Sequence, residues 1–359
     1  MKILSFESSC DETAVAVLTA DGDKITVQSN TVATQIDIHR LYGGVVPEIA
    51  SRAHIEAISA LTYQALEESG CTLADIDLIA VTANPGLIGA LLVAVNFAKS
   101  LALANSIPLV PVDHIKGHIA AAYLNTDTPP KPPFLALALS GGHTSIYRVD
   151  TYTSYRVIGE TRDDAIGESF DKIGRMIGIP YPAGRGFDAL SLEGFIEATG
   201  KTEGAYEAYK KAKLFREGDF VLPSPALNDG TLDFSFSGLK TAAINLLHRY
   251  EQKNLPLNRA LFAARYTYEV AEAVAKKVTL SIEQNPDLTA LVVAGGVAAN
   301  SHLREVLAKV AKKKGIPLHI PAISLCGDNA AMIGAQGYYE YQNGKTADST
   351  LNASAMDSI

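Results

Sequence analysis

The sequence predicts an α/β protein of two similar domains, because three supersecondary patterns occur twice along the chain in the same order. Each half has a hairpin with a polar tip, a strand that leads through a glycine-containing turn into a helix, and a short strand with a polar apex before a second helix. Two such βββαβα-like halves place a ligand cleft between them. We expect domains over residues 1–128 and 129–342, followed by a polar, disordered tail over 343–359.

The two hairpin tips differ in chemistry. The first, over residues 8–13, contains Asp11 and Glu12, which could accept a proton, orient a water or bind a cation. The second begins at Ser140 and reads Ser-Gly-Gly-His-Thr, so it offers a hydroxyl and unhindered backbone N–H groups to a phosphate. A solvated tip and a tight turn that merely requires glycine are the structural alternatives.

The second copy of the glycine turn follows an apolar strand and opens a helix at residues 298–313. Gly295 and Gly296 would let a ligand approach the backbone, and a helix N-terminus favours anionic or acceptor groups. Asn300 could hydrogen-bond a ribose or an adenine, or simply cap the helix. Without a G-x-G-x-x-G spacing, this turn also fits any α/β protein.

An insertion over residues 161–285 interrupts the second half and is mostly helical by its apolar period. Near its start, Asp171 could bind ribose hydroxyls. The alternative is an exposed helix face on which Glu168 and Lys172 form an i, i+4 pair. A rigid turn follows, in which Gly184 would let a ligand pass close to the backbone.

A metal site is predicted where the third pattern repeats. His114 and His118 are four residues apart and share one face of a helix, although an isolated pair of this spacing is more often surface or core histidine. A zinc peptidase needs Glu after the first His, and Ile115 stands there. If the internal twofold joins the two apices, Asp328 completes a set that suits Fe(II) or Zn²⁺. Cys326 could be a fourth ligand, or a buried small residue.

Composition limits the class of protein. The 359 residues are 47% hydrophobic and 19% charged, as in a well-packed soluble chain. A net charge of −8 excludes nucleic-acid binding through a global field and requires local cations. The candidate cations form two groups, namely Lys210, Lys211, Lys213 and Arg216, and Lys312, Lys313 and Lys314.

The chain is expected to be cytoplasmic and free of the membrane. Three scattered cysteines favour a reducing compartment, and an acidic residue comes too early for a secretory signal. The longest apolar stretch, residues 87–95, is too short to span a bilayer. It lies in a predicted helix over residues 87–104 that is apolar around its circumference, so this helix is either buried on all sides or leaves a face for a partner.

Together these motifs resemble the TsaD family, formerly called O-sialoglycoprotein endopeptidase, over nearly the whole chain to about Tyr341. The duplicated plan resembles the actin, sugar-kinase and Hsp70 (ASKHA) superfamily. The matching blocks are residues 7–13, 43–48, 114–118, 140–144, 170–172, 233–241, 294–300 and 328–329. Ala138 stands where archaeal and eukaryotic relatives carry a tyrosine metal ligand, which favours the bacterial type.

The resemblance implies an enzyme that transfers a threonylcarbamoyl group from threonylcarbamoyl-AMP to N6 of adenosine 37 in tRNAs reading codons that begin with adenine. It implies one divalent metal per subunit, Fe(II) favoured and Zn²⁺ possible, on His114, His118 and Asp328. It implies a TsaB-like paralogue and a TsaE-like ATPase as partners. It assigns the nucleotide site to Ala138, Leu139, Ser140, Gly141, Gly142, Asp171, Gly184, Asp188 and Asn300.

The chain departs from the family pattern near both sites. Ala183 and Arg185 occupy a turn that usually reads Pro-Gly-Gly-Pro, so a cation is expected near the nucleotide. Lys116 lies inside the histidine pair, where bacterial members often have Glu. A cation beside the metal is expected to disfavour tight metal binding slightly, unless Lys116 points toward substrate phosphate.

Three other functions stay open. An ATP-dependent small-molecule kinase of the ASKHA type is disfavoured by the histidine pair, because Mg²⁺ prefers oxygen ligands. A non-catalytic scaffold paralogue is disfavoured by the intact histidines, Asp328 and glycine turns. A glycopeptidase is disfavoured by Ile115.

Overall fold

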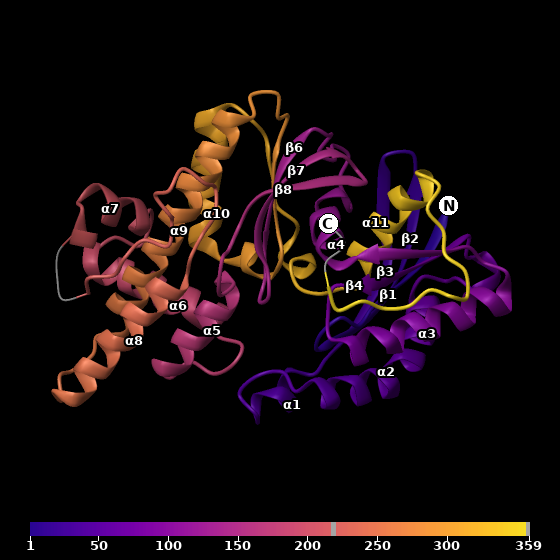
Figure 1. The fold of residues 1–359 in the computed structure, drawn as a ribbon, viewed down its shortest axis with the longest axis horizontal. Helices are drawn as coiled ribbons and strands as arrows, with labels where there is room; N and C mark the ends of the chain where they lie inside the picture. Colours follow the sequence, from indigo (N-terminus) through magenta and orange to yellow (C-terminus); the bar gives the residue numbers. More distant parts are fainter. Residues whose placement is uncertain (217–219, 357–359) are drawn as a thin grey trace.

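The computed structural model describes residues 1–216 and 220–356 and confirms an α/β fold with a duplicated core (Figure 1). Each half contains a five-stranded mixed sheet, in the orders β3-β2-β1-β4-β5 and β10-β9-β6-β7-β8. In both sheets the first three strands form an antiparallel meander, and two parallel strands extend from its first strand. The predicted repeat is therefore a repeat of topology.

The strands are β1 (Lys2–Glu7), β2 (Glu12–Asp21), β3 (Lys24–Thr34), β4 (Leu78–Asn84), β5 (Leu109–Asp113), β6 (Phe134–Leu139), β7 (Thr144–Thr151), β8 (Ser154–Glu160), β9 (Leu291–Ala294) and β10 (Leu318–His319). The helices are α1 (Ile36–Arg40), α2 (Pro47–Glu68), α3 (Ile88–Asn105), α4 (His114–Ala120), α5 (Ile166–Met176), α6 (Gly184–Thr199), α7 (Ala205–Lys211), α8 (Ser237–Gln252), α9 (Arg259–Gln284), α10 (Ser301–Lys314) and α11 (Ala330–Gln342).

Helices cover both faces of each sheet, so the central strands are apolar on both sides. In β1 the side chains of Leu4 and Phe6 pack toward α2 and α3, while Ile3 packs toward α4 and α11. The core around α4 and α11 also contains residues of β6 and β9 from the second sheet. These two helices therefore lie between the two sheets, as Figure 1 shows, and burying both of them joins the halves.

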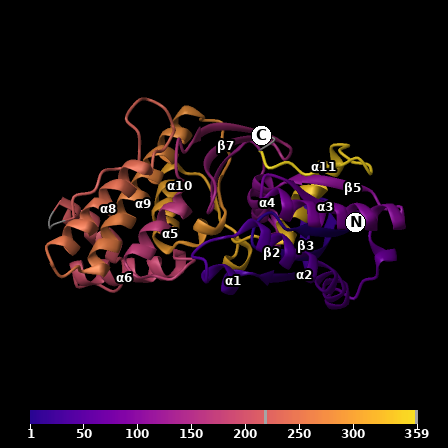
Figure 2. The same cartoon turned by 60° about the horizontal axis from the view of Figure 1, so that its bottom comes forward.

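The helices of the predicted insertion, α5 to α9, form a separate lobe on the far side of the second sheet (Figure 2). Their apolar faces, together with α10 and the outer side of β6 and β9, make one continuous core. The central helix α9 is buried along most of its length, which explains its dense run of alanine, valine and tyrosine.

The C-terminal part of the chain packs differently from the expectation. Helix α11, expected in the second domain, packs on the first sheet, where Gly334 lets it approach Leu18 and Gly337 lets it approach Ala80. The tail that follows is ordered as far as the structure describes it, and it runs along the first domain. The Leu351 carbonyl accepts from Lys99 Nζ over 2.8 Å, and Ser354 N donates to the Ala83 carbonyl over 2.9 Å.

Helix α3 is the one helix within the described ranges that is long and apolar enough to cross a membrane. Its inner face packs against strand β4 and helix α2 through small and branched residues such as Ala94 and Val95. Its outer face exposes Ile88 and Leu103. The helix is therefore buried on one side only. Of the two alternatives drawn from the sequence, burial on all sides or an exposed apolar face, the structure has the second.

Candidate metal and nucleotide site

The two histidines and Asp328 meet at the packed contact between α4 and α11. Asp113 caps α4 by accepting from the backbone N–H groups of the second and third helical residues, which places His114 at the helix start. Gly117 lets α4 approach α11, because an added Cβ there would lie 2.7 Å from Cδ1 of Ile333. Asp328 stands two residues before α11, and so reaches the histidine face of α4.

The three side chains converge on one point. Nε2 of His118 lies 3.1 Å and Nε2 of His114 lies 3.6 Å from Oδ1 of Asp328. The two imidazole rings are steeply inclined, with centroids 4.6 Å apart. One ligand atom from each of the three residues can be chosen so that all lie within 4.8 Å of one another.

The donor set fits a metal ion. Both ring nitrogens of His118 are buried, and neither makes a hydrogen bond with any residue that the structure describes. Its approach to Asp328 is close but lacks hydrogen-bond geometry, as expected when both atoms point at a third particle. A buried polar atom without a partner is costly, and a cation would satisfy it. Two imidazoles and one carboxylate suit Fe(II) or Zn²⁺.

Glu7, at the end of β1, was not singled out in the sequence and lies behind His114. Its Oε2 is 3.0 Å from Nδ1 of His114, and its carboxylate also accepts from Ser9 N and from Thr82 Oγ1. A carboxylate that holds one imidazole nitrogen leaves the other free to bind a cation. An acid that ends a fully buried strand was the available signal in the sequence.

Charges are strongly coupled around these residues. Burial lowers the pKa of His114, but the carboxylates of Glu7 and Asp328 outweigh burial and raise that pKa to about 9. Burial raises the pKa of Asp328, but His114 and His118 outweigh it and hold that pKa well below its usual range. Burial and the neighbouring His114 lower the pKa of His118. The cluster thus concentrates negative charge in a buried place, which favours a cation there.

The first hairpin tip contributes two acids with different environments. Asp11 is buried, and Glu12 is partly buried with its Oε1 accepting from Thr34 Oγ1 over 3.3 Å. Burial, followed by the charges of Asp328 and Asp11, raises the pKa of Glu12 to about 9. A pKa this far above its usual range favours the protonated form of Glu12.

The second hairpin tip forms an open, tight turn. Ser140 N donates to the His143 carbonyl over 2.9 Å, and His143 N donates to Ser140 Oγ over 3.1 Å. An added Cβ on Gly141 or Gly142 would meet nothing within 4 Å, so space beside this backbone is free. Gly167 lies against the other side of the turn, where an added Cβ would collide with the Ser140 carbonyl. The turn therefore sits against the start of α5.

The other predicted nucleotide residues form a chain of contacts along the same edge. Asp171 Oδ1 accepts from Ala183 N over 2.6 Å, which ties α5 to the start of α6. Asp188 Oδ1 accepts from the backbone and hydroxyl of Ser301, which ties α6 to the start of α10. Asn300 Oδ1 caps α10, accepting from the N–H three residues on. Beside Gly184 there is open space.

Two predicted residues offer no side chain to a ligand. Ala138 and Leu139 end β6, and their side chains are buried in the two cores on opposite faces of the sheet. Gly295, with φ of 90°, packs directly on the Leu139 carbonyl, since an added Cβ would lie 2.3 Å from it. Their contribution is to bring the glycine turn beside the hairpin turn.

Three other expectations near the site are now located. Lys116 does not stand beside the metal cluster, because its Nζ lies over the Tyr155 ring, 3.4 Å from the Thr153 carbonyl. Cys326 is buried, and its thiol contacts the Arg304 guanidinium and backbone carbonyls instead of the cluster. Arg185 is the second residue of α6, next to Gly184, and is exposed.

The two halves of the site are close enough for their charges to interact. The charge of His143 acts on Asp328, and the charges of Asp11 and Asp171 both act on Tyr181. A direct bridge closes one side, where Arg40 Nε of α1 donates to the Tyr181 carbonyl over 3.2 Å. The metal cluster and the phosphate-type turn therefore lie near each other, at the carboxyl ends of β1, β5, β6 and β9.

Comparison with known proteins gives a consistent result. The TsaD family profile, described as tRNA N6-adenosine threonylcarbamoyltransferase, matches residues 26–335. Relatives with that name include one from Clostridium botulinum strain 657, 46% identical over 353 residues, and one from Clostridium novyi, 46% identical over 354 residues. A third, from Clostridium perfringens, is 44% identical over 351 residues. Each alignment covers 98% of this chain and 96% of the relative.

Among solved structures, HypF from T. kodakarensis superposes with a TM-score of 0.54 at 13% identity, over 96% of this chain and 48% of HypF. A phosphate- and nucleotide-bound full-length HypF gives 0.51 at 14% identity, over 99% of this chain and 47% of HypF. At such low identity these two similarities support the fold alone.

Proposed function

The chain belongs to the TsaD family of tRNA N6-adenosine threonylcarbamoyltransferases, and from this premise we propose how its residues carry out the transfer. The threonylcarbamoyl group moves from threonylcarbamoyl-AMP to N6 of adenosine 37 in tRNAs that read codons beginning with adenine, and AMP is released. The observation that carries the proposal is His118, whose buried ring nitrogens make no hydrogen bond within the described residues and whose Nε2 faces Oδ1 of Asp328 over 3.1 Å.

The adenylate is held by the second domain. Its phosphate lies against the backbone of Gly141 and Gly142, where no side chain obstructs the approach. Its adenosine lies along the edge formed by Asp171, Asp188 and Asn300, whose carboxylate and amide groups can hydrogen-bond hydroxyls and ring nitrogens. In this chain the latter two are already engaged with the start of α10, so they also position that helix.

The metal would be held by His114, His118 and Asp328, one ion per subunit. Two imidazoles and one carboxylate with open positions favour Fe(II), with Zn²⁺ the alternative. When bound, the ion would supply Lewis-acid polarisation of the acyl group. Glu7 holds the Nδ1 proton of His114 and so keeps Nε2 of that ring directed into the cluster.

In the transfer itself, the N6 nitrogen forms a bond to the carbamoyl carbon, and the bond from that carbon to the phosphate oxygen breaks. AMP leaves with the bonding electron pair, held at the Ser140 turn. The N6 proton passes to Asp11, and Glu12 on the same hairpin tip is the second candidate acceptor. An exocyclic adenine amine is a poor nucleophile, so fixing its orientation supplies much of the acceleration.

We further propose a partner surface on the first domain and a cytoplasmic location. Large apolar side chains are exposed on two adjacent helices, with Ile55 and Tyr63 on α2 and Ile88 and Leu103 on α3. Such a face suits a partner of related fold, so the TsaB-like paralogue is placed there. The TsaE-like ATPase is the third component and would act on that assembly.

The test is reconstitution. The metal-loaded chain is incubated with threonylcarbamoyl-AMP and unmodified tRNA transcript, with and without the two partners, and threonylcarbamoyladenosine is measured by mass spectrometry of nucleosides. His118→Ala should lose bound metal and nearly all product, while His248→Ala, an exposed histidine on α8, should keep both. Full product formation by metal-free His118→Ala would overturn the metal role, and ATP-dependent phosphorylation without transfer would favour a kinase.

A further inference from the structure

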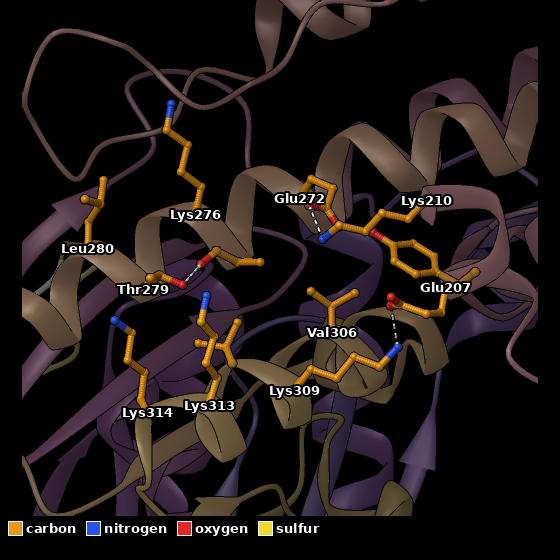
Figure 3. A pocket seen from close by; sticks show the side chains of 13 residues that line it. Glu207, Lys210, Glu272, Lys276, Thr279, Leu280, Val306, Lys309, Lys313 and Lys314 are labelled. Carbon is orange, nitrogen blue, oxygen red and sulfur yellow. Dashed lines mark hydrogen bonds and ion pairs between the residues drawn. The ribbon is translucent and has the colours of Figure 1, made fainter. Parts of the chain in front are cut away.

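Helices α7, α9 and α10 enclose a cavity of about 380 Å³ on the outer side of the helical lobe (Figure 3). Its walls include apolar side chains such as Leu280 and Val306. Its rim carries five lysines, namely Lys210, Lys276, Lys309, Lys313 and Lys314. None of the residues that border it belongs to the metal cluster or to the predicted nucleotide site.

Helical spacing explains why lysines and apolar groups share the same walls. On α10 Val306, Lys309, Val310 and Lys313 follow one another at i, i+3, i+4 and i+7, and so line one face. Lysine stems bury their methylene groups along apolar surface while their ammonium groups stay in water. The result is a groove with an apolar floor and a cationic rim.

The charges on this rim are unevenly distributed. At one end, Lys210 pairs with Glu272 over 2.7 Å and Lys309 pairs with Glu207 over 2.8 Å. Lys276, Lys313 and Lys314 lie at the other end, away from both of these glutamates (Figure 3).

The three lysines at this end differ in their contacts. Lys276 Nζ meets only the neutral amide oxygen of Asn228, and Lys314 pairs with Glu283 outside the cavity. Among the residues that the structure describes, Lys313 has no acidic partner. Of the five lysines, Lys210, Lys309 and Lys314 pair with glutamates, so Lys276 and Lys313 are the two without an acidic partner among the described residues, in a chain whose net charge is −8.

Two lysine groups that the sequence offered as alternatives thus meet in space. Lys210 belongs to the first and Lys313 and Lys314 to the second, with Lys276 added from a third helix. The side chain of Arg216 lies outside the described part.

Helix α10 connects this rim to the reaction site. It begins beside Asp188 on the nucleotide edge, and its 14 residues, the last of which are the lysines, span about 21 Å. A tRNA whose target adenosine lies in the cleft has further phosphates within such a distance.

We propose that the end of this rim formed by Lys276, Lys313 and Lys314, where only Lys314 has an acidic partner, binds phosphate groups of the tRNA that flank the loop carrying the target adenosine. The inference rests on the proposed function. A polyanion needs only spaced cations, whereas a small organic anion needs convergent polar groups at fixed positions. At this end the cavity offers flexible ammonium groups on separate helices, above an apolar floor, which matches the first requirement.

Helix stability alone does not account for the arrangement. Lys313 and Lys314 lie in the last turn of α10, where cations stabilise a helix through its dipole. Lys276 lies within α9, two turns before its end, and gains nothing from that effect. Its ammonium group nevertheless stands at the same end of the cavity.

The test is the salt dependence of tRNA binding by a double charge reversal, Lys276→Glu with Lys313→Glu. Both side chains are exposed, so thermal stability should stay unchanged. Fluorescence anisotropy with unmodified tRNA transcript is recorded over a range of salt concentrations. We expect the log–log slope to fall by about two units and the affinity at low salt to fall at least tenfold. The neutral pair Lys276→Gln with Lys313→Gln should give the same slope with a smaller loss of affinity.

The matched control is Lys201→Glu with Lys253→Glu, which makes the same charge change on the same lobe at exposed positions away from the cavity. Its slope should remain within half a unit of the wild type. Equal slopes in the two double variants would overturn the proposal, and the cavity would then suit an acidic protein partner or a small anion. Failure of the wild-type chain to transfer the threonylcarbamoyl group would instead refute the proposed function, which separates the two results.

Discussion

The carboxylate of Glu7 accepts a hydrogen bond from Nδ1 of His114 over 3.0 Å, and both side chains are nearly or fully buried. This contact joins the end of β1 to the start of α4, two segments more than a hundred residues apart in the sequence. Because Glu7 holds the proton on Nδ1, the nitrogen that a bound metal ion would use is Nε2, which faces Asp328 and His118. Glu7 is therefore a positioning residue, acting on the cluster through His114.

The substitution Glu7→Gln tests that role. The amide side chain has the same length and keeps an acceptor oxygen, but it lacks the negative charge that orients His114. Metal affinity should therefore fall about 10- to 100-fold. Chelator competition with Fe(II) or Zn²⁺ measures the affinity directly, without an activity assay. Ser9→Ala, which removes only the hydroxyl near the same nitrogen, should cost less than tenfold. Equal affinity in Glu7→Gln and wild type would show that the contact is only structural.

The two acids of the first hairpin should respond differently to amidation. Glu12, with a pKa raised to about 9 chiefly by burial, resembles glutamine in hydrogen bonding, so Glu12→Gln should retain most of the transfer rate. Asp11→Asn removes the proposed proton acceptor and should lower the turnover number by about 10²- to 10⁴-fold. Single-turnover transfer to tRNA with metal-loaded chains provides the comparison. The opposite ranking would assign the proton acceptor to Glu12.

Periodicity and repetition allowed the fold and the metal cluster to be predicted. The duplicated patterns implied two facing apices, and that symmetry joined Asp328 to a histidine pair more than two hundred residues away. The packing partners of individual helices could not be predicted, because they depend on which surfaces become buried in the folded chain. Helix α11 contains glycines at close contacts with the first sheet, and nothing local in the sequence says which sheet receives it.

At the nucleotide edge, the sequence likewise did not indicate which side chains are engaged by contacts within the fold. Asp188 and Asn300 bear groups that suit a ligand, but contacts with the start of α10 engage both. Ala138 and Leu139 precede the phosphate-type turn, and strand pairing on both sides of β6 turns their side chains into the cores. Likewise, the lysines of the rim come from three helices, and the sequence does not indicate that these helices pack together.

We expect the hydrogen bonds of Asp163 to stabilise the second domain and to make its stability depend on pH. Its carboxylate accepts from the backbone of Phe236 and Ser237 and from the hydroxyls of Ser235 and Ser237, so it caps the start of α8. Asp163→Asn should therefore lower the free energy of unfolding by about 1 kcal/mol near pH 7. Denaturant titration measures it. Asp23→Asn, at an exposed turn of the first domain, should change it by less than about 0.5 kcal/mol.

The pH dependence follows from the same contacts. Burial raises the pKa of Asp163, but the hydrogen bonds from Ser235 and Ser237 outweigh it and lower that pKa in the folded chain. A lowered folded pKa gives stability that is present above the unfolded value of about 3.9 and is lost as pH falls through the folded pKa. The difference between wild type and Asp163→Asn should therefore shrink below pH 4, and a difference that grows toward acid would contradict the cap.

Two positions on α3 separate the partner surface from the core. Val95 is fully buried against the first sheet, whereas Leu103 is 75% exposed on the outer face. Val95→Asp should destabilise the chain by more than about 4 kcal/mol, because it buries a carboxylate among apolar groups. Leu103→Asp should change stability by less than about 0.5 kcal/mol and weaken binding of the TsaB-like partner at least tenfold, measured by calorimetry.

Ser100→Asp is the control for the added charge. Ser100 is exposed on the same helix, and this substitution adds the same charge without removing an apolar side chain, so it shows how much of the loss is electrostatic. Full partner binding by a stable Leu103→Asp chain would move the docking surface away from this end of α3.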